Sequence, residues 1–247
     1  MPFNDIINLF NYISSESCLS SIGIISLAEK KYNSSGDGIV DDTNAILSAI
    51  ADASGRVLEL PPNTYRIAQN FSVPTDVCLY FVHGAKLIID SGVTVTINGK
   101  LEAGLYEIFT GAGSVVISSR MVERVVPQWW GAKGDDSNDD TSAIQKAINA
   151  HKRVYLPSGT YKITSALTLS SAGKSIVGSN WEDARIKVYG GGNAIEISNM
   201  GCCIKDIMLI ANTAGSGSGI KITRARTCHI DHVMFAEAIG SSTNNFD

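Results

Sequence analysis

The stretch VVPQWWGAKGDDSNDDTSAIQKAI (Val125–Ile148) decides the fold, because the pattern of its second part, Ala132–Ile148, recurs earlier in the same chain. The earlier copy, SSGDGIVDDTNAILSAI (Ser34–Ile50), matches it at nine positions that lie 98 residues apart. Each copy is followed by a short β-rich string, LELPPNTYRI (Leu58–Ile67) or VYLPSGTYKI (Val154–Ile163). A repeat on this scale indicates two copies of one structural unit. We expect each unit to contain a loop, a helix, a strand and a turn, in that order.

The two Asp-Asp-Thr triplets predict where the helices begin. Short side chains with oxygen atoms can accept hydrogen bonds from the first, otherwise unpaired amides of a helix, and a negative charge suits its positive end. The cap candidates are therefore Asp42, Thr43, Asp140 and Thr141. Alanine and isoleucine follow each triplet at spacings that place one apolar stripe on a helix of about three turns. Such a stripe would cover the open end of a sheet and hide its unpaired strand edges.

A shorter repeat near the C-terminus predicts stacked coils. AIEIS (Ala194–Ser198) and GIKIT (Gly219–Thr223) lie 25 residues apart, and Gly-rich turns separate the β-rich runs. This period suits one coil of a parallel β solenoid, in which equivalent residues stack about 4.8 Å apart. The 87 residues from Tyr161 onward suffice for three to four coils, and Ser241–Asp247 offers no helix to cover the last one. We therefore expect this β-helix to be incomplete at its C-terminus.

The composition excludes several classes of protein. The chain has 247 residues, of which 44% are hydrophobic and 18% are charged, and its formal net charge is −4. This balance favours a packed core over a disordered chain, and no apolar run reaches the roughly 18 residues of a membrane span. There is no basic run or basic excess that would attract a polyanion. We expect neither nucleic acid as a partner nor insertion into a membrane.

The lack of a recognisable signal peptide and the pattern of cysteines predict folding in a cytoplasm. The first positive charge is Lys30, and no A-x-A-like cleavage site follows a short apolar core, so we expect no signal peptide. The five cysteines form no CxxC pair and no zinc-like spacing with histidine. In an EF-hand count from Asp135, Asp140 and Lys146 occupy positions that calcium binding reserves for Gly and Glu. We expect reduced, buried thiols, no metal and no cofactor.

The residues of the repeated unit resemble a known family. Trp130-Gly131, the Gly-Asp turn, the Asp-Asp-Thr triplet and VYLPSGTYKI together are similar to the N-terminal signature of pectate-lyase-like right-handed parallel β-helix proteins. The doubled signature, with INGKLEAGLYEIFTGAGSVV (Ile97–Val116) between the copies, resembles the front part of bacteriophage tailspikes and capsule depolymerases. In such proteins the signature caps the helix and is not the active site. Asp136 departs from the family pattern, which has glycine at this turn.

The sequence therefore predicts an all-β fold. It is a right-handed single-stranded parallel β-helix with short N-terminal capping α-helices, preceded by a smaller helix-plus-strand module. We divide the chain into an N-terminal segment at 1–28, which is a candidate attachment or oligomerisation helix, a first cap-plus-strand module at 29–126, and a second cap with the start of the β-helix at 127–247.

The resemblance implies a homotrimeric tailspike of the virion, assembled in the host cytoplasm and attached to phage tail or baseplate proteins. It implies binding, and often cleavage, of bacterial capsular polysaccharide or lipopolysaccharide, with catalytic residues expected beyond this chain. Two alternatives stay open. One is a non-catalytic tail or adaptor protein that docks on another virion subunit, and the other is a stand-alone pectate-lyase-like polysaccharide lyase or hydrolase. Whether this chain alone is an enzyme is left open.

Paired carboxylates offer candidate chemistry, because glycoside cleavage uses one as an acid and one as a base or nucleophile. Asp206 and Asp231 lie 25 residues apart, so the period predicts that they stack on neighbouring coils. Repulsion between like charges would then raise one pKa and leave an acid beside a base. His232 is a candidate general base. The alternative is a role in turns and coil packing, as we expect for Cys228 and its equally spaced partner Cys203.

Aromatic side chains supply the second set of candidates, because their faces can stack against sugar rings. Trp181 and Tyr189 are the candidates for substrate binding. Trp129 and Trp130 lie at the entrance to the second cap, and we expect them to pack there instead.

Overall fold

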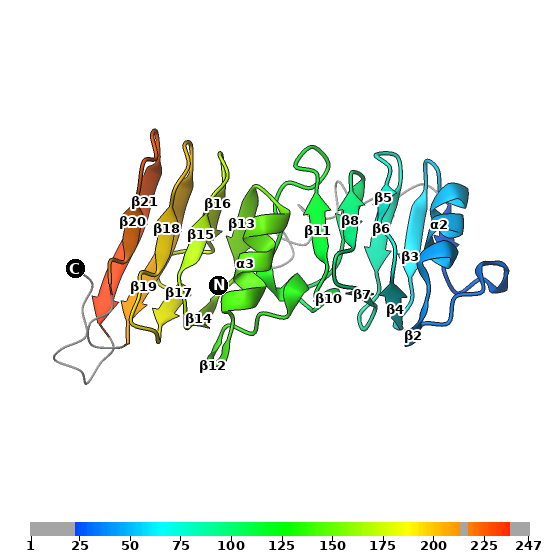
Figure 1. Cartoon of the computed structure of the whole chain (residues 1–247), viewed down its shortest axis with the longest axis horizontal. Coiled ribbons are helices and arrows are strands. Elements are labelled where there is room, and N and C mark those ends of the chain that lie inside the picture. The colour runs from blue at the N-terminus through cyan, green and yellow to red at the C-terminus, as the bar shows by residue number, and fades with distance from the viewer. Residues whose placement is uncertain (1–22, 213–216, 238–247) are drawn as a thin grey trace, which may run out of the picture.

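The chain winds into coils whose strands stack along one elongated body (Figure 1). This computed structural model describes residues 23–212 and 217–237, so the predicted helix in 1–28 lies almost wholly outside the described residues. All strand pairs in the described part of the chain are parallel. The prediction of an all-β parallel β-helix is confirmed.

The first stack contains three parallel sheets. Its strands are, in the first sheet, β1 (Ile24–Ser26), β3 (Val57–Leu60), β6 (Cys78–Phe81) and β9 (Lys100–Glu102); in the second, β2 (Asp37–Asp41), β4 (Thr64–Ile67), β7 (Lys86–Ile89) and β10 (Phe109–Gly111); and in the third, β5 (Phe71–Val73), β8 (Thr94–Ile97) and β11 (Ser114–Ile117). The first cap-plus-strand module is thus itself a short β-helix. Helix α2 (Thr43–Asp52) packs against this stack beside the 3₁₀ helix η2 (Lys30–Tyr32).

The second stack repeats this arrangement with longer strands. Its strands are β12 (Asp135–Asp139), β13 (Arg153–Leu156), β14 (Gly159–Ile163), β15 (Leu167–Leu169), β16 (Ser175–Gly178), β17 (Ala184–Val188), β18 (Ile195–Ile197), β19 (Cys203–Ala211), β20 (Ile220–Ile222) and β21 (His229–Glu237). Strands β15, β18 and β20 form one sheet, and the other seven form a second sheet. The 3₁₀ helix η3 (Pro127–Trp130) and the helix α3 (Thr141–Ala150) lead into it.

The core consists of columns of inward side chains on successive coils. Tyr65, Leu87 and Phe109 form one such column, because the register places them opposite one another, and each is at most 2% exposed. Alternate residues of each strand point outward, so the core pattern has a period of two. Burial of one such side chain contributes roughly 1.5–3 kcal/mol to folding. Stability therefore grows with each coil that is added to the stack.

The predicted helical stripes form the contact between helix and sheet. Ala45, Ile46, Ala49 and Ile50 are buried in α2, and Ala143, Ile144, Ala147 and Ile148 are buried in α3. Each helix covers the first coil of its stack with small and branched apolar side chains. The edge strands beneath are thereby shielded from pairing with other chains.

The cap prediction for Asp42 and Asp140 is wrong in its hydrogen bonds. Both are N-cap residues by position, but neither side chain binds a helix amide. Asp42 accepts from the N–H of Ser35 at 2.6 Å, and Asp140 accepts from the N–H of Lys133 at 2.7 Å. The reason is that each side chain points back toward the preceding Gly-bearing loop, where it accepts hydrogen bonds from two main-chain amides.

Asp41 and Asp139, the residues just before them, accept hydrogen bonds from the first helical amides instead. The N–H of Thr43 donates to Asp41 Oδ1 at 3.0 Å, and the N–H of Thr141 donates to Asp139 Oδ1 at the same distance. The two threonine hydroxyls accept from main-chain amides beyond β4 and β14, namely Ala68 at 3.1 Å and Thr164 at 2.9 Å. The threonines therefore tie each helix start to the adjacent coil and do not cap the helix amides.

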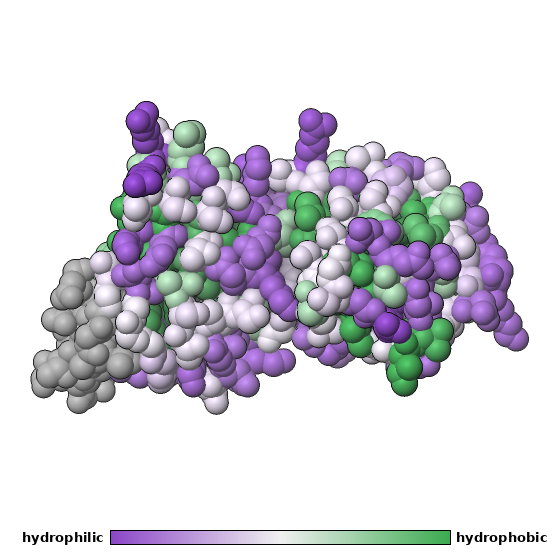
Figure 2. Space-filling view, viewed as in Figure 1, coloured by the Kyte–Doolittle hydropathy of each residue, from purple (hydrophilic) through white to green (hydrophobic). Residues whose placement is uncertain are grey.

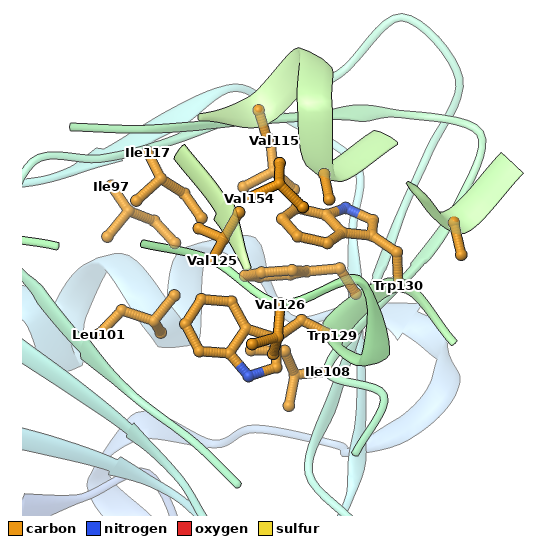
Figure 3. Packing of buried hydrophobic residues seen from close by; sticks show 14 of the residues in the cluster. Ile97, Leu101, Ile108, Val115, Ile117, Val125, Val126, Trp129, Trp130 and Val154 are labelled. Carbon is orange, nitrogen blue, oxygen red and sulfur yellow. The ribbon is translucent and has the colours of Figure 1, made fainter. Parts of the chain in front are cut away.

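The junction between the stacks is packed around two tryptophans (Figure 3). Trp129 and Trp130 are 7% and 8% exposed, which confirms that they pack at the entrance to the second cap. The ring of Trp130 lies 5.3 Å from that of Phe109 in the last coil of the first stack. Trp129 Nε1 donates to Gly104 O at 3.0 Å. Helix α3 contacts β11 on one side and β15 on the other, so it joins both stacks.

The face shown in Figure 2 is mostly polar, with separate apolar patches. The most exposed large apolar side chain of the described residues is Ile39, at 73%.

Cys78 is disulfide-bonded, which corrects the expectation that all cysteines are reduced, whereas Cys202, Cys203 and Cys228 are free. No helix in the described ranges is long and apolar enough to cross a membrane.

Candidate functional site

Strands β19 and β21 each bend sharply at one residue, and three of the candidate catalytic residues lie there. Residues 203–205 of β19 pair with β16, whereas 208–211 pair with β17. The bend falls at Asp206, whose φ is 54°, and β21 bends at His232, whose φ is 48°. A left-handed backbone at residues other than glycine costs of order 1 kcal/mol or more. The stack therefore holds these two residues against their own preference.

The register places Asp206 and His232 opposite one another. Lys205 pairs with Asp231 and Ile207 pairs with Val233, so the residues between them share a rung. Gly178 lies below Asp206 on the previous coil, where a Cβ would come 2.1 Å from Asp206 O. Glycine is required at 178 by this close approach.

Four charged or titratable groups meet at this bend, and we call them the corner cluster. Lys205 Nζ lies 2.9 Å from Asp231 Oδ2. His232 Nδ1 lies 3.2 Å from Asp231 Oδ1 and 3.6 Å from Asp206 Oδ1. The structure thus brings together the three residues that the sequence offered as catalytic candidates, and adds Lys205.

The electrostatics of the corner cluster differ from the prediction. The hydrogen bond from Lys205 lowers the pKa of Asp231, and the same bond raises the pKa of Lys205. Asp231 is therefore an ionised base near neutral pH, not the protonated member of an acid pair. The cluster is also open to water, since the His232 side chain is 67% exposed.

The predicted stacking of Asp206 on Asp231, and of Cys203 on Cys228, is wrong. The 25-residue period holds between β18 and β20, where Ile195 pairs with Ile220. Between β19 and β21 the displacement is 26, because the loop before β21 has one residue more than the loop before β19. Asp231 is thereby opposite Lys205. The extra residue in the loop before β21 is the signal in the sequence. Counting it gives a displacement of 26 residues, which would have placed Lys205 opposite Asp231.

The two candidate aromatic residues do not form one platform. Trp181 and Tyr189 flank opposite ends of β17, and five strand residues at about 3.3 Å each separate them. Trp181 is 36% exposed. Tyr189 is engaged: its hydroxyl donates to Asp136 Oδ1 at 3.1 Å, and Lys162 Nζ lies 4.8 Å from its ring centroid. A sugar could stack on Tyr189 only on ring surface that the lysine leaves free.

Asp136 links Tyr189 to β12, the first strand of the second stack. Its φ of 60° keeps the left-handed turn that Gly38 adopts in the first copy, so the departure from glycine leaves the turn geometry intact. Its carboxylate accepts from Lys187 Nζ at 2.8 Å, and this hydrogen bond raises the pKa of Lys187. The ion pair and the tyrosine contact offset the backbone strain.

A shallow polar hollow of about 400 Å³ lies beside α3. Its lining carries hydroxyl, amide and charged groups and one alanine methyl group: Asp139, Thr141, Ser142, Gln145, Lys146, Thr164, Ser165 and Ala166. Several of these groups already bind one another, as the Thr164 hydroxyl does when it donates to Asp139 Oδ2 at 2.6 Å. Within the described residues, no group of three or more His, Cys, Asp and Glu side chains is arranged to hold a metal ion.

Comparison with known proteins finds a family model that matches the second stack. Residues 126–244 match the family model described as rhamnogalacturonase A/epimerase, pectate lyase-like. This segment is pectate-lyase-like. The chain is also 27% identical over 154 residues to the capsule K3-specific depolymerase 1 of Klebsiella phage KP32. That similarity covers 49% of this chain and 17% of the phage protein. No solved structure matches the chain significantly.

Proposed function

We propose that this chain is part of a bacteriophage tailspike that binds a bacterial capsular polysaccharide or lipopolysaccharide and takes part in its depolymerisation. The observation that carries this proposal is the 27% identity to a phage capsule depolymerase. The match of residues 126–244 to a family model described as rhamnogalacturonase A/epimerase, pectate lyase-like, supports it, because a rhamnogalacturonase acts on a polysaccharide. A β-helix alone would not suffice, since one fold hosts many functions.

The proposal includes the location, the oligomeric state and the attachment of the protein. We place it in the virion as a homotrimer attached to tail or baseplate proteins, after assembly in the host cytoplasm. The division into an N-terminal segment at 1–28, a first module at 29–126 and a second module at 127–247 belongs to the same proposal. Attachment is assigned to the part of the segment that precedes β1, because β1 already pairs with β3 of the first stack.

Catalysis has two arrangements within this proposal. In the first, the catalytic residues lie outside these 247 residues, and this chain binds and positions the polysaccharide. In the second, the corner cluster performs the cleavage. Asp231, held as a carboxylate by Lys205, would be the base, so His232 or Asp206 would protonate the leaving oxygen. Trp181 is the better placed of the two aromatic candidates for a sugar contact.

The first experiment tests binding and cleavage together. The 247-residue chain is mixed with a panel of purified capsular polysaccharides, Klebsiella K3 among them, and with lipopolysaccharide. Binding is followed by calorimetry, cleavage by new reducing ends, and ultraviolet absorbance of an unsaturated product separates a lyase from a hydrolase. We expect saturable binding to one polymer. Failure to bind or cleave any bacterial surface polymer would contradict the proposal.

Variants separate the two catalytic arrangements. Asp206→Asn, Asp231→Asn and His232→Gln are compared with Glu123→Gln, which changes an exposed carboxylate elsewhere. If the corner cluster is catalytic, Asp231→Asn and at least one of Asp206→Asn and His232→Gln should reduce cleavage at least about 100-fold, the usual range for a general acid or base, while binding persists. Binding without cleavage in the unaltered chain favours the first arrangement. Cleavage that all three variants retain would exclude the second.

A further inference from the structure

One buried thiol and one partly buried thiol lie on neighbouring coils of the second stack. Cys203 pairs with His229, and the N–H of His229 donates to Cys202 O at 2.8 Å. Cys202 and Cys228 therefore share the rung just before these strands. Cys202 is fully buried, and Cys228 packs partly buried against the same core. Both side chains thus point inward, whereas the outward neighbour Cys203 belongs to the alternate set.

The two sulfur atoms lean in the same direction. Cys202 Sγ lies 3.7 Å from Ser171 O, and Cys228 Sγ lies 3.7 Å from Asn199 O. In each case the carbonyl belongs to the preceding coil. The Cys228 sulfur consequently leans toward the coil that carries Cys202. The thiol of Cys202 lies on that coil, on the same rung.

The spacing of the coils permits a covalent link. Residues that share a rung of parallel strands have Cα atoms about 4.8 Å apart. Disulfides span Cα distances of roughly 4.4–6.8 Å, but they prefer Cβ distances of up to about 4.5 Å. Stacked side chains on one rung lie at or just beyond that limit. A bond here would form after a rotation of one side chain, and its strain would make it easy to reduce.

We propose that Cys202 and Cys228 are a redox pair that forms a reversible disulfide across the last two described coils. The oxidant is a small-molecule disulfide such as glutathione disulfide. The Cys228 thiolate attacks one of its sulfurs and releases a glutathione thiolate, which leaves a mixed disulfide. The thiol of Cys202 gives its proton to that thiolate and attacks the Cys228 sulfur, which releases the second glutathione. The bond ties β21, with Asp231 and His232, to β19.

The order of attack follows from exposure. Cys228 is the more accessible of the two thiols, whereas burial raises the pKa of Cys202 and disfavours its thiolate. A small disulfide in solution therefore meets Cys228 first. The buried Cys202 reacts in the second step, where its partner is already beside it.

Peptide mapping tests the pair directly. The folded chain is incubated with glutathione disulfide, quenched in acid, alkylated with N-ethylmaleimide and digested with trypsin. Cleavage after Lys187, Lys205 and Arg226 places Cys202 and Cys203 in peptide 188–205 and Cys228 in peptide 227–247. We expect these two peptides to be joined, with a mass about 2 Da below the sum of the two peptides and the one N-ethylmaleimide adduct on Cys203, because two hydrogens are lost. Added reduced glutathione should abolish the joined species.

Three variants assign the link. Cys203→Ser should retain the joined peptides, whereas Cys202→Ser and Cys228→Ser should lose them. Circular dichroism checks that each variant keeps its β structure, and Cys203→Ser alone decides the case if the others do not fold. A link that disappears in Cys203→Ser would overturn the proposal. So would a product that carries only glutathione adducts on Cys228, or one in which none of these thiols has reacted.

Discussion

Asp140 is almost fully buried, at 1% exposed, yet it carries a carboxylate. It accepts from the N–H of Lys133 at 2.7 Å with one oxygen and from the N–H of Gly134 at 2.9 Å with the other. Burial raises the pKa of this side chain, and the two amides counter that effect. We expect Asp140→Asn to lower the free energy of unfolding by about 1–3 kcal/mol, because its NH₂ group would face one amide donor. Urea denaturation measures the loss.

The repeat supplies a matched test of the same role. Asp42 binds the amides of Ser35 and Gly36 with the same geometry, so Asp42→Asn should cost a similar amount. Glu123→Gln, at an exposed position, should stay within about 0.5 kcal/mol of the unaltered chain. Wild-type stability in Asp140→Asn would show that the buried carboxylate does not hold the loop.

At the scale of elements, the sequence predicted the helices, because their positions depend on patterns within a few residues. The helical stripes and the Asp-Asp-Thr starts specify α2 and α3 because spacing and polarity act within a few residues. The cap bonds were assigned one residue too late, since Asp41 and Asp139 can reach the same amides as their neighbours. The corner cluster was missed in part because its register depends on the length of the loop before β21. A single extra loop residue moves Lys205, in place of Asp206, opposite Asp231.

The C-terminal end of α3 carries a buried histidine that should make this element sensitive to pH. His151 is 2% exposed, with Nε2 at 3.1 Å from Val122 O in the segment that leaves the first stack. Burial lowers the pKa of His151, and the nearby charges of Lys174 and Arg153 lower it further. The unfolded chain, with a histidine pKa near 6.5, therefore binds the proton more readily than the folded chain.

The stability from His151 is fully present above about pH 6.5 and is lost as the pH falls through the lowered pKa of the folded state. Each unit of pKa difference contributes about 1.4 kcal/mol. We expect the free energy of unfolding to fall between pH 7 and pH 4.5, and His151→Gln to flatten this part of the profile. An unaltered slope in His151→Gln would refute the assignment.

At the scale of the whole molecule, the two stacks share one continuous core. The cluster of buried apolar residues runs from the first stack through Trp129 and Trp130 into the second (Figure 3). Main-chain bonds cross the junction as well: the N–H of Ile108 donates to Trp129 O at 3.0 Å. Lys146 Nζ of α3 donates to Gly111 O at 2.9 Å. Because α3 has a stack on each side, its loss from one would expose the other. We expect the chain to unfold in one calorimetric transition.

Trp130→Ala should uncouple the stacks. Truncating a buried tryptophan costs about 3–5 kcal/mol, and here the cavity opens where the stacks meet. We expect the single transition to split into two, because the first stack keeps α2 while the second loses the packing beneath α3. Trp181→Ala, at a side chain that is 36% exposed within the second stack, should keep one transition. A single transition in Trp130→Ala that merely moves to a lower temperature would show that the coupling is carried by the main-chain bonds and Lys146 instead of the tryptophan core.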